Sequence, residues 1–250
     1  MSINWTDTSL PIVHHDIITE WDIKSANTSL MKYYQLAKEK DIDYLKSLSK
    51  DKREKAVGMM CLKDKEFSDN LEKSFTRIIS EFFQANGLQK EDCISIKKDA
   101  VFVRSKLINH FQFGDSVTFV KKNEYTGFAC IPGYEFYYND KTKKFDVKGI
   151  NDISLELHKD GILDFVSEIF HYIRNESDLN EYLHAYVSAY KNRELIFDNY
   201  RQFNSDSNFL VRMAGAEVYM ESITESMMNS VDISFNYINV IIPLIKLALN

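Results

Sequence analysis

The feature that most constrains the fold is a β-prone segment that lies between two helical segments. Between residues 93 and 147, runs rich in β-branched and aromatic residues alternate with polar turns, which is typical of an antiparallel meander. On both sides of this segment, apolar residues recur at helical spacing. The sequence therefore predicts an α+β fold.

The expected elements follow from these two periodicities. An apolar run at 17–21 predicts a first, buried strand, and Gly87 is placed to end the longest of the early helices. The expected strands of the β-prone segment are 93–96, 100–104, 115–120, 127–131, 134–138 and 145–147. The expected helices are 27–37, 41–48, 51–62, 67–86, 161–174, 178–191, 216–229 and 233–249.

We expect two domains. Residues 1–150 would form a small mixed or antiparallel sheet with helices on one face, and the helical stretch 38–87 would be an insertion in it. Residues 151–250 would form a helical domain, because the β-prone runs end before 149–152.

Composition excludes several classes of protein. Hydrophobic residues make up 44% of the chain and charged residues 27%, which is typical of a globular protein rather than a disordered one. No run of about 18 apolar residues predicts a membrane span, and the first residues do not resemble a signal peptide. The cysteines, Cys61, Cys93 and Cys130, lack paired spacing, so we expect reduced thiols without a disulfide framework or a zinc site.

The formal net charge of −6 hides an asymmetry along the chain. Residues 38–65 carry nine basic and six acidic side chains, and residues 97–148 carry ten and six. Residues 151–250 carry seven basic and fifteen acidic side chains. This pattern predicts a surface in the first part of the chain that tolerates polyanions, although runs of charge are also typical of ordinary solvated faces.

Two aspartates stand at positions that can carry chemistry. Asp22 ends the 17–21 strand, and Asp99 lies in the turn of a hairpin formed by 93–103. If these strands are neighbours, the carboxylates meet at one edge of the sheet, where Mg²⁺ or Mn²⁺ would offset their repulsion. Paired carboxylates arranged in this way support two-metal phosphoryl transfer. The alternative is that Asp22 caps the next helix and Asp99 is an ordinary turn residue.

The residues around both aspartates resemble palm motifs of family B DNA polymerases. The segment 22–29, DIKSANTS, is similar to the first motif, an Asp followed by two residues and Ser-Leu-Tyr-Pro-Ser. The segment 97–103, KKDAVFV, is similar to the third motif, Asp-Thr-Asp-Ser followed by an apolar strand. The resemblance implies that Asp22 and Asp99 are catalytic ligands of Mg²⁺ or Mn²⁺, with the carbonyl of Ile23 as a further ligand.

The same resemblance implies binding residues between and after the two motifs. A basic helix would neutralise the triphosphate, and Asn27 stands where the family has the Tyr that excludes ribonucleotides. The segment 121–125, KKNEY, resembles the Lys-Lys-x-Tyr element that grips the primer, and residues 232–243 resemble the end of the thumb. The expected nucleotide-binding residues are Asn27, Lys50, Lys52, Arg53 and Lys55, and the expected nucleic-acid-binding residues are Lys121, Lys122, Tyr125 and Lys148.

These observations predict a nucleotidyltransferase of the DNA polymerase palm type, with a palm-like domain at 1–150, reduced fingers at 38–87 and a thumb-like domain at 151–250. It would bind primer–template nucleic acid and nucleoside triphosphates in the cytoplasm of a bacterial or phage-infected cell, without membrane contact. Another chain would supply the missing polymerase parts.

The alternative is a catalytically inactive, polymerase-like binding or structural subunit of a phage replication or transcription assembly. The presence of both aspartates favours the enzyme. Asn27, and Lys97 in place of the first Asp of the third motif, favour the subunit.

Overall fold

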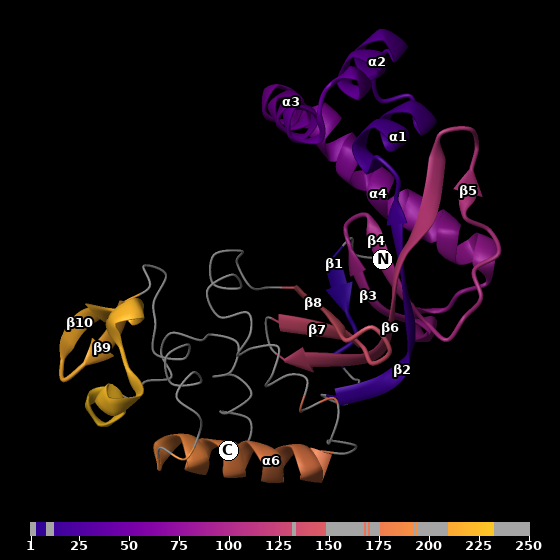
Figure 1. Cartoon of the computed structure of the whole chain (residues 1–250). Coiled ribbons are helices and arrows are strands. Elements are labelled where there is room, and N and C mark those ends of the chain that lie inside the picture. The colour runs from indigo at the N-terminus through magenta and orange to yellow at the C-terminus, as the bar shows by residue number, and fades with distance from the viewer. Residues whose placement is uncertain are drawn as a thin grey trace. The chain divides into compact units, whose positions relative to one another are not determined.

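The structure is a computed structural model, and the residues it describes are 4–8, 13–131, 134–148, 168, 170, 176–192, 194 and 210–232 (Figure 1). The chain divides into two compact units. The first unit contains Met1–Asp7 and Asp16–Tyr125, and the second contains Thr8–His15 and Thr126–Asn250. Helices occur together with an antiparallel sheet, so the predicted α+β class is confirmed.

The sheet of the first unit is built mainly from antiparallel pairs. β1 pairs with β3, β3 with β4 and β4 with β2, and β6 follows β2 in the strand order. A short strand, β5, also pairs with β6. The bounds are β1 (Asn4–Thr6), β2 (Val13–Ile23), β3 (Cys93–Lys97), β4 (Ala100–Arg104), β5 (Gln112–Phe113) and β6 (Val117–Ile131).

The helices of the first unit lie where the apolar spacing predicts them. The long helix α4 begins after Asp64, whose carboxylate accepts a hydrogen bond from the backbone N–H of Phe67 at 2.9 Å, and it ends at Gly87 with φ of 62°. Figure 1 shows α1, α2 and α3 grouped beyond the end of β2. The bounds are α1 (Ala26–Tyr33), α2 (Glu39–Ser47), α3 (Lys50–Lys63), α4 (Lys65–Asn86) and the 3₁₀ helix η1 (Lys90–Asp92).

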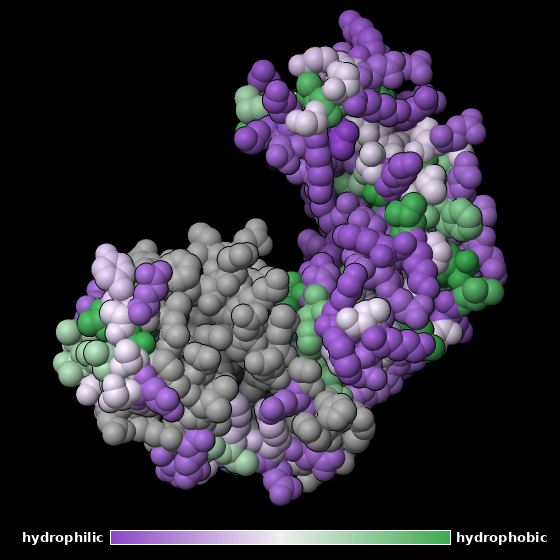
Figure 2. All heavy atoms as spheres, in the orientation of Figure 1, coloured by the Kyte–Doolittle hydropathy of each residue, from purple (hydrophilic) through white to green (hydrophobic). Residues whose placement is uncertain are grey.

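The core of the first unit forms where the apolar stripe of α4 packs on the sheet. Phe82 is fully buried and stacks on Phe119 of β6, with ring centroids 4.2 Å apart, and it also contacts Trp21 of β2. On the face drawn in Figure 2, the surface of this unit is mostly hydrophilic and its exposed apolar side chains occur in small groups. This packing fixes the end of β2 relative to α4.

One strand of the first unit differs from the prediction. The runs 115–120 and 127–131 were expected to be two strands joined by a polar turn, but β6 continues through both of them. The polar residues between them are therefore in a strand, where their side chains reach β2. We attribute the difference to tertiary pairing, which satisfies the backbone of a polar segment that has no strong strand pattern of its own.

The second unit contains the end of the meander and the described C-terminal elements. β6 pairs with β7, β7 pairs with β8, and β9 pairs with β10. The bounds are β7 (Tyr134–Asn139), β8 (Lys144–Lys148), α6 (Glu176–Lys191), β9 (Leu210–Met213), β10 (Ala216–Tyr219) and the 3₁₀ helices η2 (Met220–Ser222) and η3 (Glu225–Ser230). The helix predicted at 178–191 is confirmed by α6. Among the described residues, no helix is long and apolar enough to cross a membrane.

The helix predicted at 216–229 is wrong, because these residues begin with a strand of a hairpin. Ala214 and Gly215 have φ of 52° and 79°, which makes the tight turn between β9 and β10. Val211 is buried there with Ile223 and Val231. The boundary expected at 149–152, the helix at 233–249 and nearly all of the helix at 161–174 lie outside the described residues.

Candidate functional site

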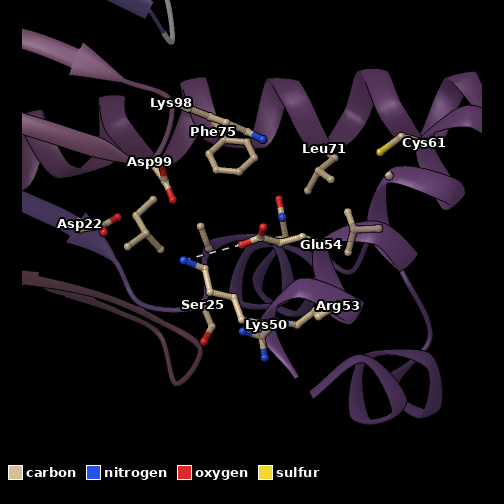
Figure 3. A pocket seen from close by; sticks show the side chains of 15 residues that line it. Asp22, Ser25, Lys50, Arg53, Glu54, Cys61, Leu71, Phe75, Lys98 and Asp99 are labelled. Carbon is tan, nitrogen blue, oxygen red and sulfur yellow. Dashed lines mark ion pairs between the residues drawn. The ribbon is translucent and has the colours of Figure 1, made fainter. Parts of the chain in front are cut away.

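A cleft of about 610 Å³ lies in the first unit, at the end of β2. This volume is within the range of about 300–1,000 Å³ that is usual for small-molecule sites. Figure 3 shows Asp22 and Asp99 on the sheet side of the cleft, Phe75 and Leu71 from α4, and charged side chains from α3. The cleft therefore has charged walls and an apolar part.

The two aspartates are brought together by strand pairing, as predicted. β2 runs antiparallel to β4 with Asp22 opposite Ala100, and the backbone N–H of Ile23 donates to the carbonyl oxygen of Asp99 at 3.1 Å. Asp99 lies in the two-residue turn between β3 and β4. Asp22 is not the cap of α1, because Ser25 holds that position. The alternative role of Asp22 as a helix cap is thus excluded.

The surroundings of the two carboxylates disfavour their negative charge. Burial, and then the charge of Asp22, raise the pKa of Asp99 above its ordinary value. One oxygen of Asp22, Oδ1, is buried and has no hydrogen-bond partner among the described residues. Because an unsatisfied buried carboxylate oxygen is costly, this arrangement fits a site that binds a positively charged group.

A charged network missed by the sequence analysis adjoins Asp22. Glu20 is 1% exposed, and its Oε2 accepts hydrogen bonds from Asn123 at 2.6 Å and Tyr125 at 3.0 Å. Lys122 Nζ lies 3.5 Å from Glu20 Oε1 and 3.4 Å from Asp22 Oδ2. Burial lowers the pKa of Lys122, but the charges of Glu20 and Asp22 outweigh it and raise the pKa.

Glu20 did leave a signal in the sequence. It lies two residues before Asp22 in an apolar strand, and this spacing places both carboxylates on the same face. An acidic residue in a strand that is predicted to be buried needs a charged or hydrogen-bonding partner.

The basic side of the cleft comes from α3. Lys50 and Arg53 line it, together with Glu54, whose Oε1 lies 3.9 Å from Lys50 Nζ. Arg53 makes no ion pair with any described residue, so its charge is available in the cleft. The predicted residues Lys52 and Lys55 are exposed and do not line the cleft, because their positions on the helix face away from it.

Two other cleft residues have a left-handed backbone, which is unusual outside glycine. Ser25 has φ of 51° and Lys98 has φ of 53°. The ammonium of Lys98 lies 5.0 Å from the centre of the Phe75 ring. Asn27 lines the cleft, and its Oδ1 is a buried acceptor without a partner among the described residues. Strained backbone and unsatisfied polar atoms of this kind collect at functional sites.

Of the predicted nucleic-acid contacts, Lys122 and Tyr125 meet at Glu20, whereas Lys121 and Lys148 each pair with a carboxylate close by in the chain. Lys121 pairs with Glu124 at 2.7 Å, while Lys148 pairs with Asp146 at 2.7 Å in the second unit. The expectation of a base-stacking ring at Tyr125 is corrected, because this residue is 3% exposed and packs beside Phe102. Its hydroxyl bonds to Glu20, so its position is in the core.

A divalent cation would find two side-chain ligands rather than a larger cluster. Within the described ranges, no three His, Cys, Asp or Glu side chains converge on one point. Asp22 and Asp99 supply carboxylate oxygens, and Asp22 Oδ1 is unsatisfied, so the residues present fit a hard cation that takes its other ligands from water or substrate.

Comparison with known proteins gives one result beyond the geometry. No curated protein matches the chain. Residues 2–250 match the family described as Bacteriophage PBS1 gene 130 protein, and since the match covers nearly the whole chain, the protein belongs to this family.

Proposed function

We propose that the cleft binds a nucleoside triphosphate together with Mg²⁺ or Mn²⁺, and that the protein transfers the nucleotidyl group to the end of a nucleic-acid primer. The observation that carries this proposal is the placement of Asp22 and Asp99 in the same cleft as Arg53, which makes no ion pair with any residue that the structure describes. Carboxylates for a cation and a guanidinium for phosphate are the two halves of a phosphoryl-transfer site.

The proposal gives separate roles to the acidic, basic and apolar residues of the cleft. Asp22 and Asp99 would hold the cation, which when bound supplies Lewis acidity and neutralises phosphate charge. Arg53 and Lys50 would bind the triphosphate oxygens, and Lys98 adds positive charge on the side of the β3–β4 turn. The apolar part of the cleft, with Phe75, would exclude water from the bound nucleotide.

The resemblance to family B polymerase palms supports the same proposal. In both of the similar segments, the aspartate ends a strand or lies in a hairpin turn, and α3 lies between them in the chain. In this reading residues 1–150 are a palm with reduced fingers at 38–87, and residues 151–250 take the place of a thumb. The protein would act in phage nucleic-acid synthesis.

Binding can be tested before activity. Arg53→Gln should weaken the binding of Mg²⁺–ATP, measured by isothermal titration calorimetry, about tenfold or more, because it removes a charge-assisted bond to phosphate. The matched control is Lys52→Gln, which removes one positive charge from the same helix outside the cleft. Equal affinity of the two variants would contradict the placement of the triphosphate.

Activity is tested by primer extension with labelled DNA or RNA primer–templates, Mg²⁺ or Mn²⁺, and deoxy- or ribonucleotides in separate reactions. Extension should disappear in Asp22→Ala and in Asp99→Ala, while circular dichroism and thermal unfolding show that both variants are folded. Full extension by either variant would show that the substituted aspartate is not part of the catalytic site.

The second candidate function is binding without catalysis, as a subunit of a phage replication or transcription assembly. It is favoured by Lys122, whose ammonium already pairs with Asp22 and supplies part of the positive charge that a cation would bring. Nucleotide binding that depends on Arg53, combined with no extension under any of the conditions above, would establish this candidate over the first.

A further inference from the structure

Beside the cleft, Lys122 forms ion pairs with both Glu20 and Asp22, and Glu20 is held in place more firmly than Lys122. Glu20 is 1% exposed and is held by Asn123 and Tyr125, at 2.6 and 3.0 Å. The side chain of Lys122 is 51% exposed, and its ammonium is shared between Glu20 and Asp22, at 3.5 and 3.4 Å. Lys122 can therefore leave Asp22 without losing all of its negative partners.

A cation bound at Asp22 would compete with this ammonium. Two positive groups repel each other when they share one carboxylate, and the repulsion is strong at short distance in a partly buried site. Because Glu20 stays in place, it offers Lys122 a carboxylate that the cation does not use. The energy needed to free Asp22 is thus smaller with Glu20 present than without it.

We propose that Lys122 is the counter-ion of Asp22 in the ligand-free protein, and that Glu20 is a positioning residue which retains Lys122 when a divalent cation takes its place. This inference rests on the proposed cation site at Asp22 and Asp99. It assigns Lys122 and Glu20 to the control of cation affinity rather than to contact with a primer. Lys122 keeps Asp22 neutralised until a cation arrives, and Glu20 limits how strongly Lys122 opposes that cation.

The experiment measures Mn²⁺ binding alone, from the loss of the free-ion electron paramagnetic resonance signal, without nucleotide or nucleic acid. Lys122→Met should bind Mn²⁺ about tenfold more tightly than the wild type, because the competing charge is gone. The control is Lys106→Met, which removes an equally exposed and ion-paired lysine (53% exposed, 3.2 Å from Asp92) and should leave the affinity unchanged. Adding Asp22→Asn to Lys122→Met should abolish the binding.

Glu20 is tested by a double-mutant cycle. Glu20→Gln should weaken Mn²⁺ binding in the wild-type background, and the effect should shrink in the Lys122→Met background, because Glu20 acts through Lys122. A purely structural role of Glu20 would give the same change in both backgrounds.

Two results would overturn the role given to Lys122, and they differ in their consequence for the proposed function. If the wild type binds Mn²⁺ and Lys122→Met binds it no more tightly, then Lys122 is not the counter-ion and the proposed function stands. If neither the wild type nor any variant binds Mn²⁺, the result contradicts both the cation site of the proposed function and this inference.

Discussion

The backbone N–H of Ile23 donates a hydrogen bond to the carbonyl oxygen of Asp99 at 3.1 Å. This bond joins the end of β2 to the β3–β4 turn, and so it brings Asp99 next to Asp22. The two carboxylates are neighbours because of backbone pairing rather than through any attraction between their side chains. A fold that holds two like charges together in this way gives up stability, which is typical of functional sites.

The first prediction concerns the stability cost of Asp99. Burial, and then Asp22, raise its pKa in the folded protein, so its ionisation lowers the free energy of unfolding at pH values above the raised pKa. Asp99→Asn should raise the free energy of unfolding at neutral pH by about 1 kcal/mol. The gain should shrink as the pH falls through the raised pKa, and it should disappear below the ordinary value of 3.8, where the wild-type carboxyl is protonated in both states.

Urea unfolding at a series of pH values measures this difference. A variant that is less stable than the wild type at neutral pH would show that ionised Asp99 is stabilised by its surroundings, against the direction of its pKa.

The second prediction uses the cysteines as reporters of the cleft. Cys61 lines the cleft and is half-buried, whereas burial raises the pKa of Cys93 to about 12. Because the thiolate is the reactive form, iodoacetamide should modify Cys61 and leave Cys93 unmodified in the folded protein. Mg²⁺–ATP should slow the modification of Cys61.

Peptide mass spectrometry measures the labelling of each cysteine separately. Cys130, in the second unit, is the internal reference for reagent consumption, and Cys93 should react only after denaturation. Labelling of Cys61 that is unaffected by saturating nucleotide would place the ligand away from this end of the cleft.

The third prediction compares two helix N-termini. The side chain of Asp64 caps α4 through the N–H of Phe67, while Ser49 at the start of α3 makes no side-chain capping bond. Asp64→Ala should lower the free energy of unfolding by about 1 kcal/mol. Ser49→Ala, the matched control, should change it by much less. Similar losses in chemical denaturation would mean that the Asp64 hydrogen bond does not stabilise the helix.

The fourth prediction concerns the core that positions the cleft. Phe82 is fully buried between Trp21 and Phe119, so Phe82→Ala removes a large volume from a packed interface. The expected loss in free energy of unfolding is about 3–5 kcal/mol. Tyr44→Ala, at a position 63% exposed, should stay within about 0.5 kcal/mol of the wild type. Equal denaturation midpoints for Phe82→Ala and Tyr44→Ala would contradict this account of the core.

Local patterns were sufficient to predict much of the first unit. Helical spacing predicted α1 to α4, and Gly87 predicted the end of α4. Two short β-prone runs on either side of a polar turn predicted the β3–β4 hairpin with Asp99 in its turn. These features depend on contacts between residues close in the chain, which periodicity and turn chemistry record. The same local reasoning wrongly predicted a helix at 216–229. The turn at Gly215 and the burial of Val211 favour a hairpin there.

The sequence by itself therefore determined the α+β class and the two aspartates as candidate partners. Only the tertiary structure decided which charges meet them. In the folded protein, Arg53 lines the cleft and Lys52 does not. The ammonium of Lys122 lies next to Asp22, and Tyr125 is buried beside Glu20. These outcomes depend on the order of strands in the sheet, with β2 between β4 and β6, and strand order is set by pairings between residues about 80 to 105 positions apart in the chain. No local periodicity carries that information, because it arises only when distant segments pack together.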